Sequence, residues 1–316
     1  MLTTDDRINL AKHALLTYTK SEETGKNFSL ENEETPTEVR EFYNNLHVFE
    51  AGKKEIDYCH VFLNESAKKA VVAFRGTTSD EGKSLADWMN NMKQILVQYS
   101  KDRPDNVIHE GYNNSIEGLR SVKNKHSNSI EQLLNTWKAE GKATKIHITG
   151  HSKGGALAGL FAARISDVFG KENTHVVTFA APKLGNEKFK EYYDSLVGEH
   201  HRYENVYDLV PQLPLVNMGL GRARALAIKT FIPAAKVLFQ DTDDKFVHLG
   251  KRAVLSVDEK VKSLFSNIDE NKYYKAAVAA SFISSVKTVK FKFKAVPGEC
   301  INQHGMEKYL GFLQSR

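Results

Sequence analysis

The sequence predicts a three-layer α/β domain with a mostly parallel central sheet, because strand and helix patterns alternate along its middle third. Two segments have the apolar periodicity and the length of helices, Gly154–Val168 and Asn186–Leu196. They separate three short strand-like segments, Lys145–Thr149, His175–Ala180 and Arg202–Val206. Strands separated by helices of this length form crossover units, in which the strands run parallel and the helices cover the sheet.

The N-terminal part of the chain predicts one helix followed by strands. Thr4 and the acidic residue after it suit the start of a helix, which apolar residues at helical spacing continue to about Tyr18. The polar stretch 21–37 is expected to be a loop. Glu55–Glu65 and Lys68–Gly76 have strand patterns, and the middle of the second is apolar on both faces, as suits the centre of a sheet.

The segments that flank the alternating middle complete the domain. Apolar residues at helical spacing over 130–137 predict a helix, and Gly141 is a natural end for it. After Pro214 the pattern loosens. A further helix is expected over Tyr273–Val286, and the strict alternation of Val289–Val296 predicts an edge strand with one wet face.

Composition and charge favour a globular protein and argue against nucleic acid as a partner. The 316 residues are 41% hydrophobic, which is enough for a sizeable core. No shift in composition divides them, so we expect a single domain over residues 1–316. The 44 Lys and Arg against 39 Asp and Glu give a net charge of +5. This mild excess favours an anionic membrane surface but is too small to indicate nucleic-acid binding.

The cysteines and the apolar runs bear on metals and on the compartment. Cys59 and Cys300 show neither a CxxC pair nor metal-ligand spacing, so we expect no metal centre and favour a reducing compartment, with a single disulfide left open. The first residues lack the basic-then-apolar layout of a secretory signal, and no uncharged apolar run reaches membrane-spanning length. We expect a soluble protein, either cytoplasmic or exported by a route that needs no cleaved signal.

One short motif carries chemistry. Gly150, Ser152 and Gly154 form a G-x-S-x-G pattern between a predicted strand and a predicted helix. A serine at such a tight junction has a strained backbone, and side chains two residues away on either side would collide, which explains the glycines. The helix that follows directs its N-terminal N–H groups at the reaction centre, where negative charge develops. Ser152 is therefore a candidate nucleophile.

The chain resembles class 3 (fungal-type) lipases, an α/β-hydrolase family, in several blocks that occur in the family's order. The blocks cover roughly residues 70–250, with a weaker match near His304: VVAFRGTTS and LADWMNNM, VIHEGYNNS, ITGHSKGGALAGL, VVTFAAPKLGN, NVYDLVPQLP and FVHLG. The resemblance implies a three-layer α/β-hydrolase fold with a lid-like segment at 78–92. It also implies helical and strand inserts within 215–297.

A serine nucleophile needs an imidazole to take its proton and a carboxylate to orient that imidazole. In α/β-hydrolases the partners follow in the order serine, acid, histidine. Asp208 comes just after a predicted strand and is the candidate acid. By resemblance, His304 is the candidate base, whereas His248 matches a structural block and stays as the alternative. The other histidines, including His151, are expected to be packing or surface residues.

Two donors are expected to bind the oxyanion. One is the backbone N–H of Lys153, the residue after the serine. The other, by resemblance, is Thr77, through its amide and its hydroxyl. Lys153 is a departure, because fungal members usually have leucine there and some bacterial relatives have the GHSKG form. A backbone donor tolerates this change, but the lysine side chain alters the surroundings of the oxyanion, so the resemblance leaves the substrate preference open.

The resemblance also implies a lid over the site. We expect Leu85, Trp88 and Met89 to cover the cleft in water, the alternative being an ordinary surface helix with Trp88 in the core. The stretch 215–239 is apolar with interspersed basic residues, so it suits either a membrane surface or a packed cap over the acyl pocket.

Together these features predict a carboxylic ester hydrolase that acts on acylglycerols or glycerophospholipids through an acyl-serine intermediate. The substrate is expected at a lipid or membrane surface, with no metal or organic cofactor. The sequence leaves any protein partner unknown. Within enzymes, the alternatives are a phospholipase A-type effector and an acyltransferase. A peptidase is disfavoured by the lipase-type blocks, by analogy only. Outside enzymes, the alternative is an inactive hydrolase fold that serves as a membrane-binding or scaffold module.

Overall fold

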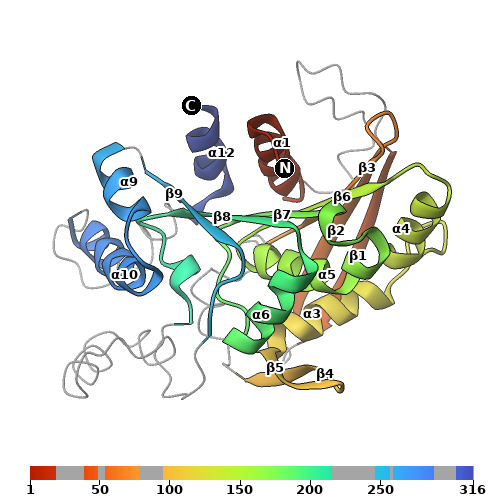
Figure 1. Ribbon diagram of the computed structural model, residues 1–316, viewed down its shortest axis with the longest axis horizontal. Coiled ribbons are helices and arrows are strands. Elements are labelled where there is room, and N and C mark those ends of the chain that lie inside the picture. The colour runs from red at the N-terminus through yellow and green to blue at the C-terminus, as the bar shows by residue number, and fades with distance from the viewer. Residues whose placement is uncertain are drawn as a thin grey trace.

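The central sheet and its flanking helices are described by a computed structural model over residues 1–18, 39–48, 54–77, 95–214, 246–256, 259–287 and 304–315 (Figure 1). Within these residues the sheet has seven strands in the order β1-β2-β3-β6-β7-β8-β9. Their bounds are β1 Val39–Val48, β2 Lys54–Asn64, β3 Lys69–Phe74, β6 Lys145–His151, β7 Thr174–Phe179, β8 Glu199–Asn205 and β9 Lys251–Leu255.

The sheet is mostly parallel, as the sequence predicts. Strands β3, β6, β7, β8 and β9 pair in parallel, while β1 and β2 pair antiparallel at one edge. Strand β1 was not expected, because its centre, Asn44–Asn45, interrupts the apolar pattern that marks a strand. The parallel strands bring their carboxyl ends to one edge, where the residues after β3, β6 and β8 meet.

Helices cover both faces of the sheet (Figure 1). On one face lie α5 (Lys153–Phe169), α3 (Glu110–Ser121) and α6 (Glu187–Leu196). On the other face, α1 (Thr4–Leu16) and α12 (Met306–Gln314) lie side by side. The first and last described helices of the chain therefore form one layer, and each reaches the carboxyl edge of the sheet.

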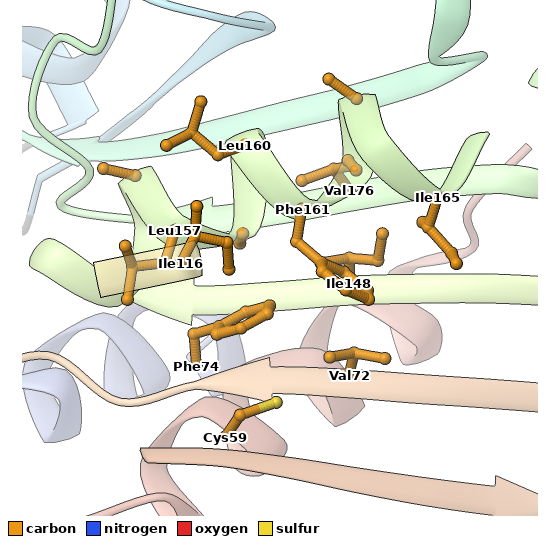
Figure 2. Close-up of a cluster of buried hydrophobic side chains, with 14 of the residues drawn as sticks. Cys59, Val72, Phe74, Ile116, Ile148, Leu157, Leu160, Phe161, Ile165 and Val176 are labelled. Carbon is orange, nitrogen blue, oxygen red and sulfur yellow. The ribbon is translucent and has the colours of Figure 1, made fainter. Parts of the chain in front are cut away.

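The larger core lies between α5 and the sheet (Figure 2). Phe161 of α5 packs against Phe74 of β3, with ring centroids 5.4 Å apart. Cys59 of β2 is fully buried in the same cluster, and burial raises the pKa of its thiol well above the usual value. A well-packed layer of this kind fixes α5, and with it the turn from which α5 starts.

The remaining described elements surround this sandwich. They are a two-stranded antiparallel sheet of β4 (Leu96–Ser100) and β5 (Arg103–His109), the helices α4 (Ile130–Ala139), α9 (Glu259–Ser266) and α10 (Glu270–Lys287), and the 3-10 helices η3 (Lys171–Asn173) and η4 (Val210–Gln212). The helix expected over 273–286 lies within α10. The loop expected over 21–37 and the strand expected over 289–296 lie outside the described residues. No helix in the described part of the chain is long and apolar enough to cross a membrane.

Candidate active site

Ser152 lies at the turn between β6 and α5, where the sequence places a candidate nucleophile. Its backbone has φ 60° and ψ −131°, a conformation that L-residues rarely adopt, and its amide donates to the carbonyl of Phe179 at 2.9 Å. The residue is 2% exposed. Its Oγ has no hydrogen-bond partner among the described residues, so none of them fixes the direction of the hydroxyl.

The glycines on either side of Ser152 are required by close backbone contacts. A Cβ on Gly150 would collide with the carbonyl of Gly154, and a Cβ on Gly154 would collide with the carbonyl of Phe74. The start of α5 therefore packs directly on the end of β3. These contacts give the steric reason for the G-x-S-x-G spacing.

Asp208 follows β8 and is fully buried. Its Oδ1 accepts a hydrogen bond from the amide of Val210 at 2.9 Å. Its Oδ2 accepts from Tyr309 Oη at 2.8 Å and from His304 Nδ1 at 2.7 Å. The hydroxyl of Tyr309 accepts in turn from the amide of Asn205, at 3.0 Å. The carboxylate is thus fixed by its own loop and by α12, which lies about a hundred residues further along the chain.

The histidine beside Asp208 is His304. Because Nδ1 of His304 donates to the carboxylate, Nε2 is the nitrogen left for proton transfer, and it has no partner within the described part of the chain. His248, the alternative, lies elsewhere, with Nε2 3.8 Å from Oε1 of Glu204. Burial and several nearby cations, Arg202 first, lower the pKa of His248 well below its usual value.

His151 joins the serine turn to His304. Its Nε2 donates to the backbone carbonyl of His304 at 2.7 Å, and the two rings lie 4.5 Å apart between centroids. Since a carbonyl only accepts, Nδ1 of His151 is the acceptor and receives the hydroxyl of Tyr18 at 2.7 Å. Burial and the neighbouring His304 lower the pKa of His151 well below its usual value, so this imidazole stays neutral. His151 is a buried, fully bonded residue and not a surface one.

Tyr18 extends this chain of hydrogen bonds to the segment after β3. Its hydroxyl accepts from the amide of Gly76 at 3.2 Å. A Cβ on Gly76 would lie 2.9 Å from Cβ of Ser152 and 2.7 Å from the carbonyl of His151. The segment that contains Gly76 and Thr77 therefore runs directly against the serine turn, which is where an oxyanion donor is needed.

Lys153 opens α5, and its side chain is buried. Its Nζ lies 2.8 Å from Oδ1 of Asp57 on β2. Burial and, to a smaller extent, the charge of Lys153 lower the pKa of His109 to about 4. His109 caps the start of α3, so β2, α3 and α5 converge behind the serine turn.

Several residues of this site were not singled out for a role in it from the sequence. Tyr18, Tyr309 and Asp57 were given no role, and His151 was expected only to pack or to lie at the surface. The position of His151 next to the serine was the one usable signal. The lid-like segment 78–92 with Leu85, Trp88 and Met89, and the stretch 215–239, lie outside the described residues. Among the described residues no group of three His, Cys, Asp or Glu side chains is arranged to hold a metal ion.

A parallel sheet with a strained serine between strand and helix, and with an Asp–His pair at the same edge, defines an α/β-hydrolase fold. The triacylglyceride lipase of Rhizomucor miehei has a similar structure, with a TM-score of 0.56 and 17% identity over 83% of each chain. Residues 71–218 match the model of the family described as Lipase (class 3). This stretch, just under half of the chain, is therefore similar to class 3 lipases, and the structure has the same fold as a lipase of that kind.

Curated relatives match over a shorter part of their length. A lipase of Caenorhabditis elegans is 29% identical over 157 residues, which is 49% of this chain and 40% of the relative. The chloroplastic galactolipase DONGLE of Arabidopsis thaliana is 30% identical over 183 residues, covering 50% and 37% respectively. The chain thus spans about two fifths of the length of these relatives.

Proposed function

We propose that this protein hydrolyses acyl esters of glycerolipids through an acyl-serine intermediate. In this proposal Ser152 is the nucleophile, His304 the general base and Asp208 the acid that orients it. The backbone amides of Thr77 and Lys153 bind the oxyanion. The observation that carries the proposal is the 2.7 Å hydrogen bond between Asp208 and His304, which leaves Nε2 of that histidine unpartnered within the described residues. His151, adjacent to the serine, bonds the backbone of the same histidine.

The order of the reaction steps follows from the position of the proton on His304. With its Nδ1 proton bonded to Asp208, His304 accepts the hydroxyl proton of Ser152 at Nε2. The serine oxygen attacks the ester carbonyl, and the carbonyl π electrons move to oxygen and form a tetrahedral oxyanion. When the oxyanion collapses, the bond to the alkoxide breaks and His304 gives its proton to the departing alcohol. Water then repeats the sequence on the acyl-serine and releases the fatty acid.

The oxyanion step explains why backbone amides next to the serine matter. An N–H aimed at the tetrahedral oxygen stabilises the transition state more than the flat ester, and removing one such donor lowers kcat by about 100- to 1,000-fold. Lys153 starts α5, whose N-terminus favours negative charge at this point. Gly76, which precedes Thr77, lies against the serine turn.

The names of the relatives support glycerolipids as the substrate class. A lipase and a galactolipase are among the relatives to which this chain is similar, and both names denote ester cleavage on lipids. Lipases, phospholipases and galactolipases differ in the head group of their substrate, which is absent, a phosphate or a sugar. The lid at 78–92, the inserts within 215–297 and a single domain over 1–316 remain part of the proposal.

A lipid panel tests the proposal. Purified wild-type protein and the Ser152→Ala variant are incubated with triacylglycerol, phosphatidylcholine, phosphatidylglycerol and a galactolipid, and the released fatty acids are measured by mass spectrometry. We expect fatty-acid release from at least one lipid by the wild type only, with a fluorophosphonate probe attached to Ser152. A folded protein that releases no fatty acid and takes up no probe is an inactive module. Transfer of the acyl group to an added alcohol in place of water is acyltransferase activity.

A further inference from the structure

Lys153 and Asp57 form a buried ion pair behind the candidate oxyanion hole. Nζ of Lys153 lies 2.8 Å from Oδ1 of Asp57, and the two side chains are 4% and 2% exposed. Oδ2 of Asp57 has no hydrogen-bond partner among the residues that the structure describes. Lys153 is the residue after the candidate nucleophile. The residue that supplies the cation of this pair therefore also carries the backbone amide that is proposed to bind the oxyanion.

Backbone contacts between β2 and the end of β3 connect the neighbourhood of Asp57 with the second candidate oxyanion segment. Cys59 of β2 pairs with Phe74 of β3. One step further, the amide of Arg75 donates to the carbonyl of Tyr58 at 3.0 Å, which continues the antiparallel ladder. Tyr58 directly follows Asp57 and Arg75 directly precedes Gly76, so this hydrogen bond joins the immediate neighbours of Asp57 and Gly76. The ion pair therefore connects the start of α5 with the strand that flanks the Gly76–Thr77 segment.

Packing alone does not explain a charged pair at this position. Burying two charges removes them from water, and exchange of a buried ion pair for apolar side chains of similar volume is often neutral or stabilising. As noted from the sequence, fungal members of the family usually have leucine where Lys153 stands. An ion pair differs from a leucine contact in having a fixed direction, which constrains where Lys153 and β2 lie relative to one another.

We propose that the Lys153–Asp57 ion pair positions the two oxyanion donors relative to each other. Both side chains are then positioning residues for acyl transfer, because they act through the amides of Lys153 and Thr77 and do not touch the reacting atoms. This inference rests on the proposed function. It predicts that removal of the pair lowers kcat even when the fold is as stable as before.

The test compares Asp57→Asn, Lys153→Met and the double variant with the wild type. Hydrolysis of a short-chain nitrophenyl ester gives kcat and KM, and thermal melting gives stability. We expect each variant to lose about 10- to 100-fold in kcat, with KM changed by less than about twofold, because the oxyanion forms only in the transition state. The melting temperature should fall in each single variant and recover in the double variant, in which no buried charge is unpaired.

Two further variants separate positioning from stability. Lys153→Arg keeps the ion pair and should retain clearly more kcat than Lys153→Met. Leu134→Ala, in the fully buried part of α4, should lower the melting temperature without lowering kcat at 25 °C. If the double variant regains the wild-type kcat together with its melting temperature, the pair is only structural and the inference is wrong. The same holds if folded Lys153→Arg is no better than Lys153→Met.

The outcome for the proposed function is separate. A wild-type protein that hydrolyses neither esters nor lipids and takes up no fluorophosphonate at Ser152 refutes the proposed function, and the inference falls with it. An active wild type whose double variant is equally active refutes the ion-pair inference alone.

Discussion

The two sides of the candidate site differ in how far along the chain their residues lie. The nucleophile side consists of residues 150–155, a contiguous turn whose shape follows from glycine contacts. The acid–base side joins Asp208 to His304 and Tyr309, which come from α12 and the residues just before it. Ser152 contributes a hydroxyl with no partner among the described residues, whereas the carboxylate of Asp208 accepts bonds from three described groups. A change at Ser152 should therefore affect catalysis without affecting the stability of the fold, whereas a change at Asp208 should affect both.

The largest expected effect tests that separation directly. Ser152→Ala and Asp208→Ala should both reduce ester hydrolysis by at least about 10,000-fold. The melting temperature of Ser152→Ala should stay within about 2 °C of the wild type, because no hydrogen bond within the described residues is lost. Asp208→Ala should lose about 2–4 kcal/mol of unfolding free energy, since three buried donors lose their acceptor. Equal stability of the two variants, measured by urea unfolding, would contradict the comparison.

The identity of the base is tested by a pair of histidine variants. His304→Ala should lower kcat about 1,000-fold or more, because no other described imidazole contacts Asp208. His248→Ala should lower kcat less than about 10-fold, although it disturbs the buried ionic cluster around Glu204 and so lowers stability. Both are measured on the same ester at a temperature where circular dichroism shows folded protein. The assignment of the base is wrong if only the His248 change removes activity.

The hydroxyl of Tyr309 gives a smaller effect on the acid–base side. Tyr309→Phe removes one donor to Asp208 and the acceptor for the amide of Asn205. We expect a loss of about 1–3 kcal/mol in unfolding free energy and about 10-fold in kcat. The matched variant is Tyr203→Phe, in a tyrosine of β8 that stacks on Phe179 in the same core cluster as Tyr309, for which kcat should not change. A kcat loss of the same size in both variants would mean that the packing of this core cluster, and not the hydroxyl of Tyr309, matters for activity.

Tyr18 provides the corresponding test on the nucleophile side. Tyr18→Phe leaves Nδ1 of His151 and the amide of Gly76 without their partner. Because these groups act through the backbone of the serine turn, we expect a loss of about two- to fivefold in kcat and about 1 kcal/mol in stability. If this variant loses as much kcat as Tyr309→Phe, catalysis depends equally on contacts distant in sequence at the nucleophile side and at the acid–base side.

Buried histidines set the pH range in which these comparisons hold. His200 lies between Tyr193 and Thr178, and burial lowers its pKa to about 3. In the unfolded chain this imidazole takes up a proton near pH 6.5. Between pH 6.5 and 3 the unfolded state therefore binds more protons than the folded state, and stability decreases as the pH is lowered. The loss is about 1.4 kcal/mol per pH unit for each such histidine. In urea unfolding between pH 7 and 4.5, His200→Gln should show a shallower pH dependence than the wild type, and an unchanged slope would refute this assignment.

The fold and the serine turn could be predicted from sequence because both depend on local patterns. Alternating strands and helices gave the mostly parallel sheet, and the glycine spacing gave the turn at Ser152. Asp208 and His304 were paired by family resemblance and lie in contact, while their catalytic roles remain predictions. The contact of Tyr18 with His151 joins residues 133 positions apart, and no local pattern encodes a contact of that kind. The pairing of Asp57 with Lys153 was missed for the same reason.

The buried position of Cys59 makes alkylation of its thiol a measure of how often the core opens. The thiol lies on β2 beside β3, fully enclosed, and burial raises its pKa, so it is scarcely ionised at neutral pH (Figure 2). Alkylating reagents react with the thiolate. Modification of the peptide that contains Cys59, followed by mass spectrometry over time, would therefore measure how often the core around β2 opens in solution.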